Sequence, residues 1–165
     1  MVEKVDNNNL ENIMINEIYD EDFIKVKYLI DEVSNYTYKS LIPKKDYEYF
    51  KKKMWSLEFI KKDAREGYTI VVKDKEKIIG TGTIVGNYIS KIYIKPEYHG
   101  KGIGKLIMKC LEKKAKSNGV KTIFLASNLN AEKFYTKLGY ETTENKELYT
   151  PDGYVFKVSW MKKDS

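Results

Sequence analysis

Apolar residues recur along two stretches of the chain with the 3.6-residue period of an amphipathic helix. The first stretch follows Asp20, a residue type that caps helix starts, and the second ends at Asn118-Gly119, a pair typical of helix ends. Each stretch therefore predicts a helix that buries one face. The two apolar stripes consist of Phe23, Val26, Leu29, Ile30 and Val33, and of Ile103, Leu106, Ile107, Cys110, Leu111 and Ala115.

Shorter apolar and β-branched runs predict strands at residues 13–18, 68–72, 78–85, 88–94, 121–126 and 155–161. Because a helix connects the strand at 88–94 to the strand at 121–126, we expect these two to be parallel. Pro43 begins a further helical region that we expect to break near Ser56. Gly80 and Gly82 lie inside one strand, where glycine marks a bulge or a close approach.

The composition is that of a globular protein, with 165 residues of which 42% are apolar. We expect a flexible polar extension at residues 1–11 and one domain over residues 12–165. The single cysteine, Cys110, excludes an intrachain disulfide and favours a cytoplasmic location. We find neither a signal peptide nor an apolar run of the ~20 residues that a membrane helix needs, and expect no membrane partner. The net charge of +6 comes from scattered lysines, so it suits an anionic cofactor, and we expect no nucleic-acid partner.

Three glycines, Gly100, Gly102 and Gly104, separate the strand at 88–94 from the helix that follows. A glycine loop at a helix N-terminus favours an anion site, since backbone amides point outward and the helix dipole adds positive charge. Lys101 and Lys105 are unfavourable there unless an anion binds, although they can also be plain solvated lysines. The spacing matches neither a P-loop nor a dinucleotide-binding fingerprint.

The segment Ile94-Lys95-Pro96-Glu97-Tyr98-His99-Gly100-Lys101-Gly102-Ile103-Gly104 resembles motif A of the GCN5-related N-acetyltransferases. This resemblance implies that loop amides hold the pyrophosphate of coenzyme A and that the preceding strand pairs with the pantetheine arm. His99 replaces the usual Arg or Gln, which keeps a donor but loses the permanent charge. The implied cofactor residues are Gly100, Lys101, Gly102, Ile103, Gly104 and Lys105 in the loop, His99 before it, and Ile92, Tyr93 and Ile94 in the strand.

A second segment, residues 130–140, is similar to motif B of the same family and contains Asn-Ala-x-x-Phe-Tyr-x-Lys-x-Gly-Tyr. The resemblance implies that Tyr135 contacts the cofactor and acts as general acid, because a neutral phenol can protonate the departing thiolate. Read from its pattern alone, Tyr135 is a core aromatic on an apolar helix face. Asn130 either bonds the pantetheine or acceptor or only caps the helix, and we assign Lys133 to cofactor binding.

The resemblance implies a small, single-domain, bacterial-type member with an α+β fold. Its sheet is expected to be mixed and mostly antiparallel, with splayed central parallel strands flanked by helices. The implied reaction is direct transfer of an acetyl group from acetyl-CoA, without a metal, to an amine of a small molecule or peptide. The alternative is a CoA-binding sensor without catalysis, and a homodimer is possible in either case.

The sequence leaves the general base and the acceptor open. Tyr88, Ser90 and Tyr93 are poor bases at neutral pH, so either a water chain or a distant carboxylate such as Glu32 is required. Two sets of residues can each shape an acceptor pocket or serve a purely structural purpose, as an aromatic core and as a solvated helix face. They are the aromatic residues Tyr36, Tyr38, Tyr47, Phe50, Trp55 and Phe59, and the acidic residues Asp20, Glu21, Asp22, Asp31 and Glu32.

Overall fold

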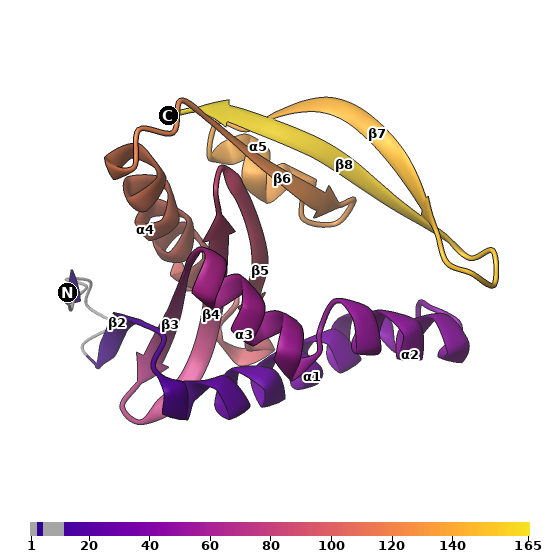
Figure 1. Cartoon of the computed structure of the whole chain (residues 1–165), viewed down its shortest axis with the longest axis horizontal. Helices are drawn as coiled ribbons and strands as arrows, with labels where there is room; N and C mark the ends of the chain where they lie inside the picture. The colour runs from indigo at the N-terminus through magenta and orange to yellow at the C-terminus, as the bar shows by residue number, and fades with distance from the viewer. Residues whose placement is uncertain (1–2, 5–11) are drawn as a thin grey trace.

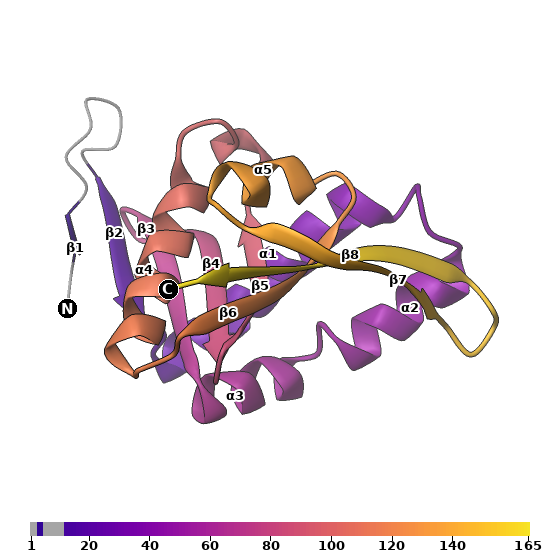
Figure 2. The same cartoon turned by 90° about the horizontal axis from the view of Figure 1, so that it is seen from above.

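The computed structural model describes residues 3–4 and 12–165 and contains one mixed sheet with helices on both faces (Figures 1 and 2). Among these residues the strand order is β1-β2-β3-β4-β5-β6-β8-β7. The strands are β1 (Glu3–Lys4), β2 (Ile13–Glu17), β3 (Tyr68–Asp74), β4 (Lys77–Val85), β5 (Tyr88–Ile94), β6 (Thr122–Asn128), β7 (Glu141–Tyr149) and β8 (Val155–Asp164). The helices are α1 (Phe23–Tyr38), α2 (Lys44–Lys53), α3 (Leu57–Glu66), α4 (Ile103–Ser117) and α5 (Glu132–Lys137).

The α+β architecture confirms the expected fold class. Every pair of neighbouring strands is antiparallel except β5 and β6, which are parallel and are joined by α4. The expected N-terminal extension lies outside the described residues, apart from Glu3–Lys4, which pair with β2. Within the described part of the chain, no helix is both long and apolar enough to span a bilayer.

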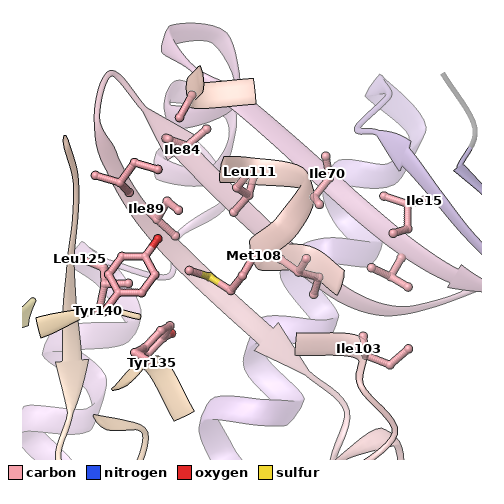
Figure 3. Close-up of a cluster of buried hydrophobic side chains, with 14 of the residues drawn as sticks. Ile15, Ile70, Ile84, Ile89, Ile103, Met108, Leu111, Leu125, Tyr135 and Tyr140 are labelled. Atoms are coloured by element: carbon pink, nitrogen blue, oxygen red, sulfur yellow. The ribbon is translucent and has the colours of Figure 1, made fainter. Parts of the chain in front are cut away.

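The two faces of the sheet carry separate cores because side chains alternate along each strand. In β3, Ile70 and Val72 belong to the cluster that α4 covers, while Val71 between them joins the cluster beneath α1, α2 and α3. Figure 3 shows Met108 and Leu111 of α4 directed at the strands. The predicted stripe of α4 is largely confirmed, with Met108 as a fully buried addition and Leu106 and Cys110 only partly buried.

The first helix begins later than its sequence predicts. Asp20 does not cap α1, because residues Asp20–Asp22 form a 3-10 turn before it. Asp22 is buried instead and pairs with Lys73 of β3 at 2.9 Å, so the acidic group is used to fix the turn to the sheet. The predicted break at Ser56 is confirmed, since its hydroxyl accepts the Phe59 N–H at 3.2 Å and caps α3.

The parallel strands β5 and β6 separate after a very short contact. Their register includes only Tyr88 opposite Phe124 and Ile89 opposite Leu125. Beyond Ile89, β5 continues to pair with β4 while β6 turns away with β8 and β7, as Figure 1 shows. The edge of β5 from Ser90 onward therefore presents backbone groups that β6 does not satisfy.

A β-bulge lies in β5 where the strands separate. Thr81 and Thr83 of β4 face Tyr93 and Ser90, so β5 holds one extra residue, and Lys91 adopts a left-handed φ of 53°. The bulge predicted from Gly80 and Gly82 is confirmed in β4, where Val72 and Lys73 of β3 face Gly80 and Ile78 and Ile79 is the extra residue, and the bulge in β5 is a second one. Gly82 is needed for packing, because a Cβ there would lie 2.5 Å from Ile107 Cγ2 of α4.

Gly82→Ala should lower the free energy of unfolding by about 1–3 kcal/mol, since the added methyl overpacks the α4 interface. Gly80→Ala is the matched control in the same strand, where the nearest atom to a Cβ is 3.2 Å away. Urea denaturation followed by circular dichroism measures both. Equal midpoints for the two variants would contradict the close approach of α4 to Gly82.

Candidate functional site

The glycine loop opens the N-terminus of α4 toward solvent. Gly100 and Gly102 have φ angles of 75° and 83°, and a Cβ at either position would meet no atom within 4 Å. Gly102 is the N-cap of α4, and no side chain of the described residues caps the helix there. The first N–H groups of α4 therefore lack intrahelical partners, and Lys101 and Lys105 are exposed beside them. This geometry suits an anion.

The third glycine of the loop has a different purpose. A Cβ on Gly104 would lie 3.0 Å from Phe134 Cζ and 3.2 Å from Ile94 Cδ1. Because Gly104 has no side chain, α5 and β5 can both approach the first turn of α4. The anion site at the loop is thus tied to the two elements that hold the remaining candidate residues.

His99 is exposed and its ring contacts the strand before the loop. Its Nε2 lies 3.0 Å from the carbonyl oxygen of Ile94, and a contact with a carbonyl requires the ring nitrogen to donate. The histidine that departs from the family pattern thus links the end of β5 to the start of the loop.

Residues of motif B lie on and before α5. Tyr135 is buried, whereas Asn130 and Lys133 are exposed. The capping reading of Asn130 is wrong, because the N-cap position is Ala131 and the side chain that bonds the Ala131 N–H, at 2.9 Å, is Asn128. Asn128, the last residue of β6, therefore bonds the turn before α5 in place of Asn130.

A cavity of about 270 Å³ extends between the separated strands, with a neighbouring cavity of about 250 Å³ at the mouth. Of the candidates from the sequence, Ile92, Tyr93 and Tyr135 line the larger cavity together with Asn128 and Ala131. Figure 3 shows Tyr135 beside Tyr140 in the buried cluster on the α4 side of the sheet. Other candidates lie outside its lining, namely Ile94, His99, the loop from Gly100 to Lys105, Asn130 and Lys133.

Four aromatic rings form one wall of the larger cavity, and we call them the aromatic wall: Tyr38, Phe50, Trp55 and Phe156. Tyr38 stacks on Trp55 with ring centroids 5.7 Å apart, and Phe50 meets Phe156 at 5.5 Å. Tyr38 also contacts Phe156, and Phe50 contacts Trp55, so each ring of the aromatic wall packs against two others.

The aromatic residues that the sequence singled out separate into two groups. Tyr38, Phe50 and Trp55 line the larger cavity and Phe59 the smaller one, which favours the pocket reading for these four. Tyr47 packs on Trp55 from within the core, and Tyr36 is exposed on α1. Sequence reasoning missed Phe156, because its predicted strand alternates without distinguishing a pocket from a core.

A hydrogen bond spans the two halves of the site. Asn128 Nδ2 donates to the Tyr38 hydroxyl at 2.8 Å, joining the end of β6 to the end of α1. The same Asn128 accepts the Ala131 N–H through Oδ1. One side chain therefore positions both the wall and the helix that holds Tyr135.

Charged groups are confined to the mouth of the site. Lys91, the bulge residue, pairs with Asp63 of α3, and both line the smaller cavity. Glu32, the distant carboxylate that we considered as base, is outside both linings and pairs with Lys95 at 2.5 Å. Neither Lys91 nor Asp63 was expected from the sequence, which gives no signal for a pair 28 residues apart.

The phenols that line the larger cavity are held neutral. Burial raises the pKa of Tyr135, Tyr93 and Tyr88 above the usual range. Burial also raises the pKa of Tyr38, against the opposing effect of the bond from Asn128. These groups can therefore donate hydrogen bonds or protons but are poor bases.

Asn128→Ala should lower the free energy of unfolding by about 1–2 kcal/mol, because it leaves the Ala131 N–H and the Tyr38 hydroxyl without this partner. Asn130→Ala is the matched control and should change it by less than about 0.5 kcal/mol, since Asn130 is exposed. Thermal unfolding of the ligand-free variants provides the measurement. A larger loss for Asn130→Ala would contradict the assignment of the turn to Asn128.

Comparisons with known proteins agree with this geometry. The sequence model of the acetyltransferase (GNAT) domain matches residues 32–156. The chain is 34% identical over 87 residues to the uncharacterized N-acetyltransferase YjcF of Bacillus subtilis, which covers 50% of the chain and 62% of that relative. It is 27% identical over 79 residues to the peptidyl-lysine N-acetyltransferase YjaB of Salmonella typhimurium, covering 48% of the chain and 53% of that relative.

Solved structures share the fold over nearly the whole chain. A GCN5-related N-acetyltransferase from Rhodopseudomonas palustris has a TM-score of 0.80 at 17% identity, covering 92% of this chain and 94% of that one. The PaiA N-acetyltransferase of Thermoplasma acidophilum, in complex with coenzyme A, has a TM-score of 0.72 at 22% identity, with 93% and 99% covered. The match over residues 32–156, together with the separated parallel strands and the open glycine loop, shows that the chain belongs to the GNAT acetyltransferase family.

Proposed function

We propose that this protein transfers an acetyl group from acetyl-CoA to an amine, with direct attack of the amine on the thioester. The observation that carries the proposal is the separation of β5 from β6, which leaves an unpaired strand edge between an open anion site and a cavity. A long ligand fits this arrangement if its phosphate binds the anion site and its amide-containing arm lies along the strand edge.

The cofactor side of the site is assigned to backbone groups. N–H groups of the loop from Gly100 to Lys105 bind the pyrophosphate, and Lys101 and Lys105 add positive charge beside it. The free edge of β5 at Ile92, Tyr93 and Ile94 pairs with the pantetheine arm, as an added strand would. Asn130, Lys133 and His99 are assigned to side-chain contacts with the cofactor, as the resemblance to the two motifs implies.

Tyr135 is the proton donor in this proposal. Acetyl-CoA supplies the thioester, and a neutral phenol that lines the cavity can donate to the sulfur as the carbon–sulfur bond breaks. Burial raises the pKa of Tyr135, which keeps the donor protonated well above neutral pH and makes the phenol a weaker acid that holds its proton until negative charge develops on the sulfur. With raised pKa values on all its phenols, the cavity has no strong base among its described tyrosines.

A CoA-binding sensor without catalysis is the competing function. Thermal shift with acetyl-CoA, followed by thiol release with a panel of amines, separates the two. Stabilisation together with amine-dependent thiol release supports the transferase. Stabilisation by acetyl-CoA with no thiol release from any amine would support the sensor function instead.

Tyr135→Phe should reduce kcat by about 100-fold, because the leaving sulfur loses its proton donor. Tyr140→Phe is the matched control, since Tyr140 is also buried but bonds Glu112 outside the cavity lining, and it should retain activity. Because burial raises the pKa of Tyr135, wild-type kcat should not fall between pH 8 and about 9.5 through loss of the acid form. Full activity of the Tyr135→Phe variant would contradict the assignment of Tyr135 as proton donor.

A further inference from the structure

The lining of the larger cavity contains almost no charged side chains. Of the described residues around it, Lys91 is the one with a charged side chain, and it is directed to the mouth by its pairing with Asp63. The remaining polar side-chain groups of that lining are hydroxyls, the amide of Asn128 and the indoles of Trp55 and Trp160. An ammonium ion entering this space would lose its hydration without meeting an unpaired carboxylate, and cation–π attraction to the aromatic rings would offset only part of that cost.

The acidic residues of α1 and of the turn before it do not supply the missing carboxylate. Asp22 pairs with Lys73, Asp31 with Lys27, and Glu32 with Lys95. None of these carboxylates lines either cavity. Asp20 and Glu21 are also absent from both linings, so none of the five acidic residues that could have attracted a polycation faces the site.

The rest of the acceptor side is mostly apolar. The aromatic wall lies on one side, and Leu148 of β7 and Val158 of β8 add aliphatic surface. The β7–β8 hairpin is fixed to α2 by a buried hydrogen bond from the Thr150 hydroxyl to Asp46. Figure 1 shows this hairpin extending over the same side of the molecule as α2. The cavity of about 270 Å³ must also receive the end of the pantetheine arm beside Ile92 and Tyr93, so the space left for the acceptor takes a compact body.

We propose that the acceptor is a compact amine with an aromatic or apolar body, and that it enters and attacks as the neutral amine. The proposal rests on the acetyl-transfer function above. It also accounts for the missing base, since an amine that arrives neutral needs none for the attack. At pH 7.4 a lysine-type amine with a pKa near 10.4 is only about 0.1% neutral, whereas an arylamine is neutral throughout.

The reaction balances without a base from the chain. The amine nitrogen forms a bond to the acetyl carbon, the carbon–sulfur bond breaks, and the sulfur leaves with the electron pair. The nitrogen loses one proton and the sulfur gains one, with Tyr135 donating to sulfur and recovering a proton derived from the amine. The products are the N-acetyl amine and the free thiol of coenzyme A.

The pH dependence follows from the groups that face the acceptor. They are Tyr38 of α1, Tyr88, Tyr93 and Lys91 of β5, Asp63 of α3 and Tyr135 of α5. The four phenols stay neutral because burial raises the pKa of each, and Lys91 and Asp63 neutralise one another. The acceptor itself should therefore set the pH profile of kcat/KM.

The test compares an aniline, a phenethylamine with the same ring substituents, spermidine and a lysine-containing peptide, with thiol release as readout. We expect kcat/KM for the aniline to be flat from pH 6.5 to 9. For the phenethylamine it should rise about tenfold per pH unit from pH 7 to 9, as the neutral fraction rises. Spermidine and the peptide should be at least about 100-fold poorer than the better aromatic amine at pH 7.4.

A carboxylate added to the site should change the preference. Met54 lines both cavities and is 50% exposed, so Met54→Glu can be accommodated. We expect it to raise kcat/KM for spermidine relative to the aniline at least fivefold, with the neutral Met54→Gln as control. If wild type prefers spermidine or the peptide, or if the phenethylamine profile does not rise with pH, this proposal is overturned and acetyl transfer stands. Acetyl-CoA binding with no thiol release from any acceptor would overturn both.

Discussion

The parallel pairing of β5 with β6 stops after two residues, and most of the site depends on that interruption. Buried backbone N–H and C=O groups need partners, so a sheet interrupted at its centre is costly unless something else binds there. The left-handed Lys91 turns β5 at this point, and the Asn128–Tyr38 bond holds the end of β6 against α1. The strands are thus held apart by specific contacts on both sides.

Two consequences follow from keeping the strands apart. On one side, Gly104 lets α5 approach α4, so Tyr135 of α5 lines the cavity while the glycine loop lies outside its lining. On the other side, the aromatic wall fills the space beneath β8 and makes the remaining cavity apolar. Burial then raises the pKa of the phenols around it, so they stay protonated, hold their protons more tightly than a free tyrosine and act as hydrogen-bond donors rather than as bases.

Much of the fold was predictable because its signals are local. The helix stripes, the glycine loop and the segment containing Tyr135 each lie within about a dozen consecutive residues, and short-range pattern is what sequence periodicity reports. The parallel pair followed from the strand–helix–strand order. The family resemblance supplied the expectation that this pair is splayed.

The rest of the site could not be predicted because it is made by contacts between distant residues. Tyr38 and Asn128 are 90 residues apart, and Lys91 and Asp63 are 28 apart. Phe156 has the same alternation as any half-buried strand residue, so its place in the aromatic wall depends on how β8 pairs with β6. The sequence pattern indicates Asn130 as a helix cap, but Asn128, at the end of β6 and two residues beyond the predicted strand, bonds the turn instead.

The most direct test of the central claim is hydrogen–deuterium exchange of the backbone amides with and without acetyl-CoA. If the separated strand edge and the glycine loop hold the cofactor, exchange should slow at Ser90 to Ile94 and at Gly100 to Lys105. Amides of β3, which are already paired on both sides, should not change. Binding of acetyl-CoA with unchanged exchange at both segments would contradict the account, because the cofactor would then lie elsewhere.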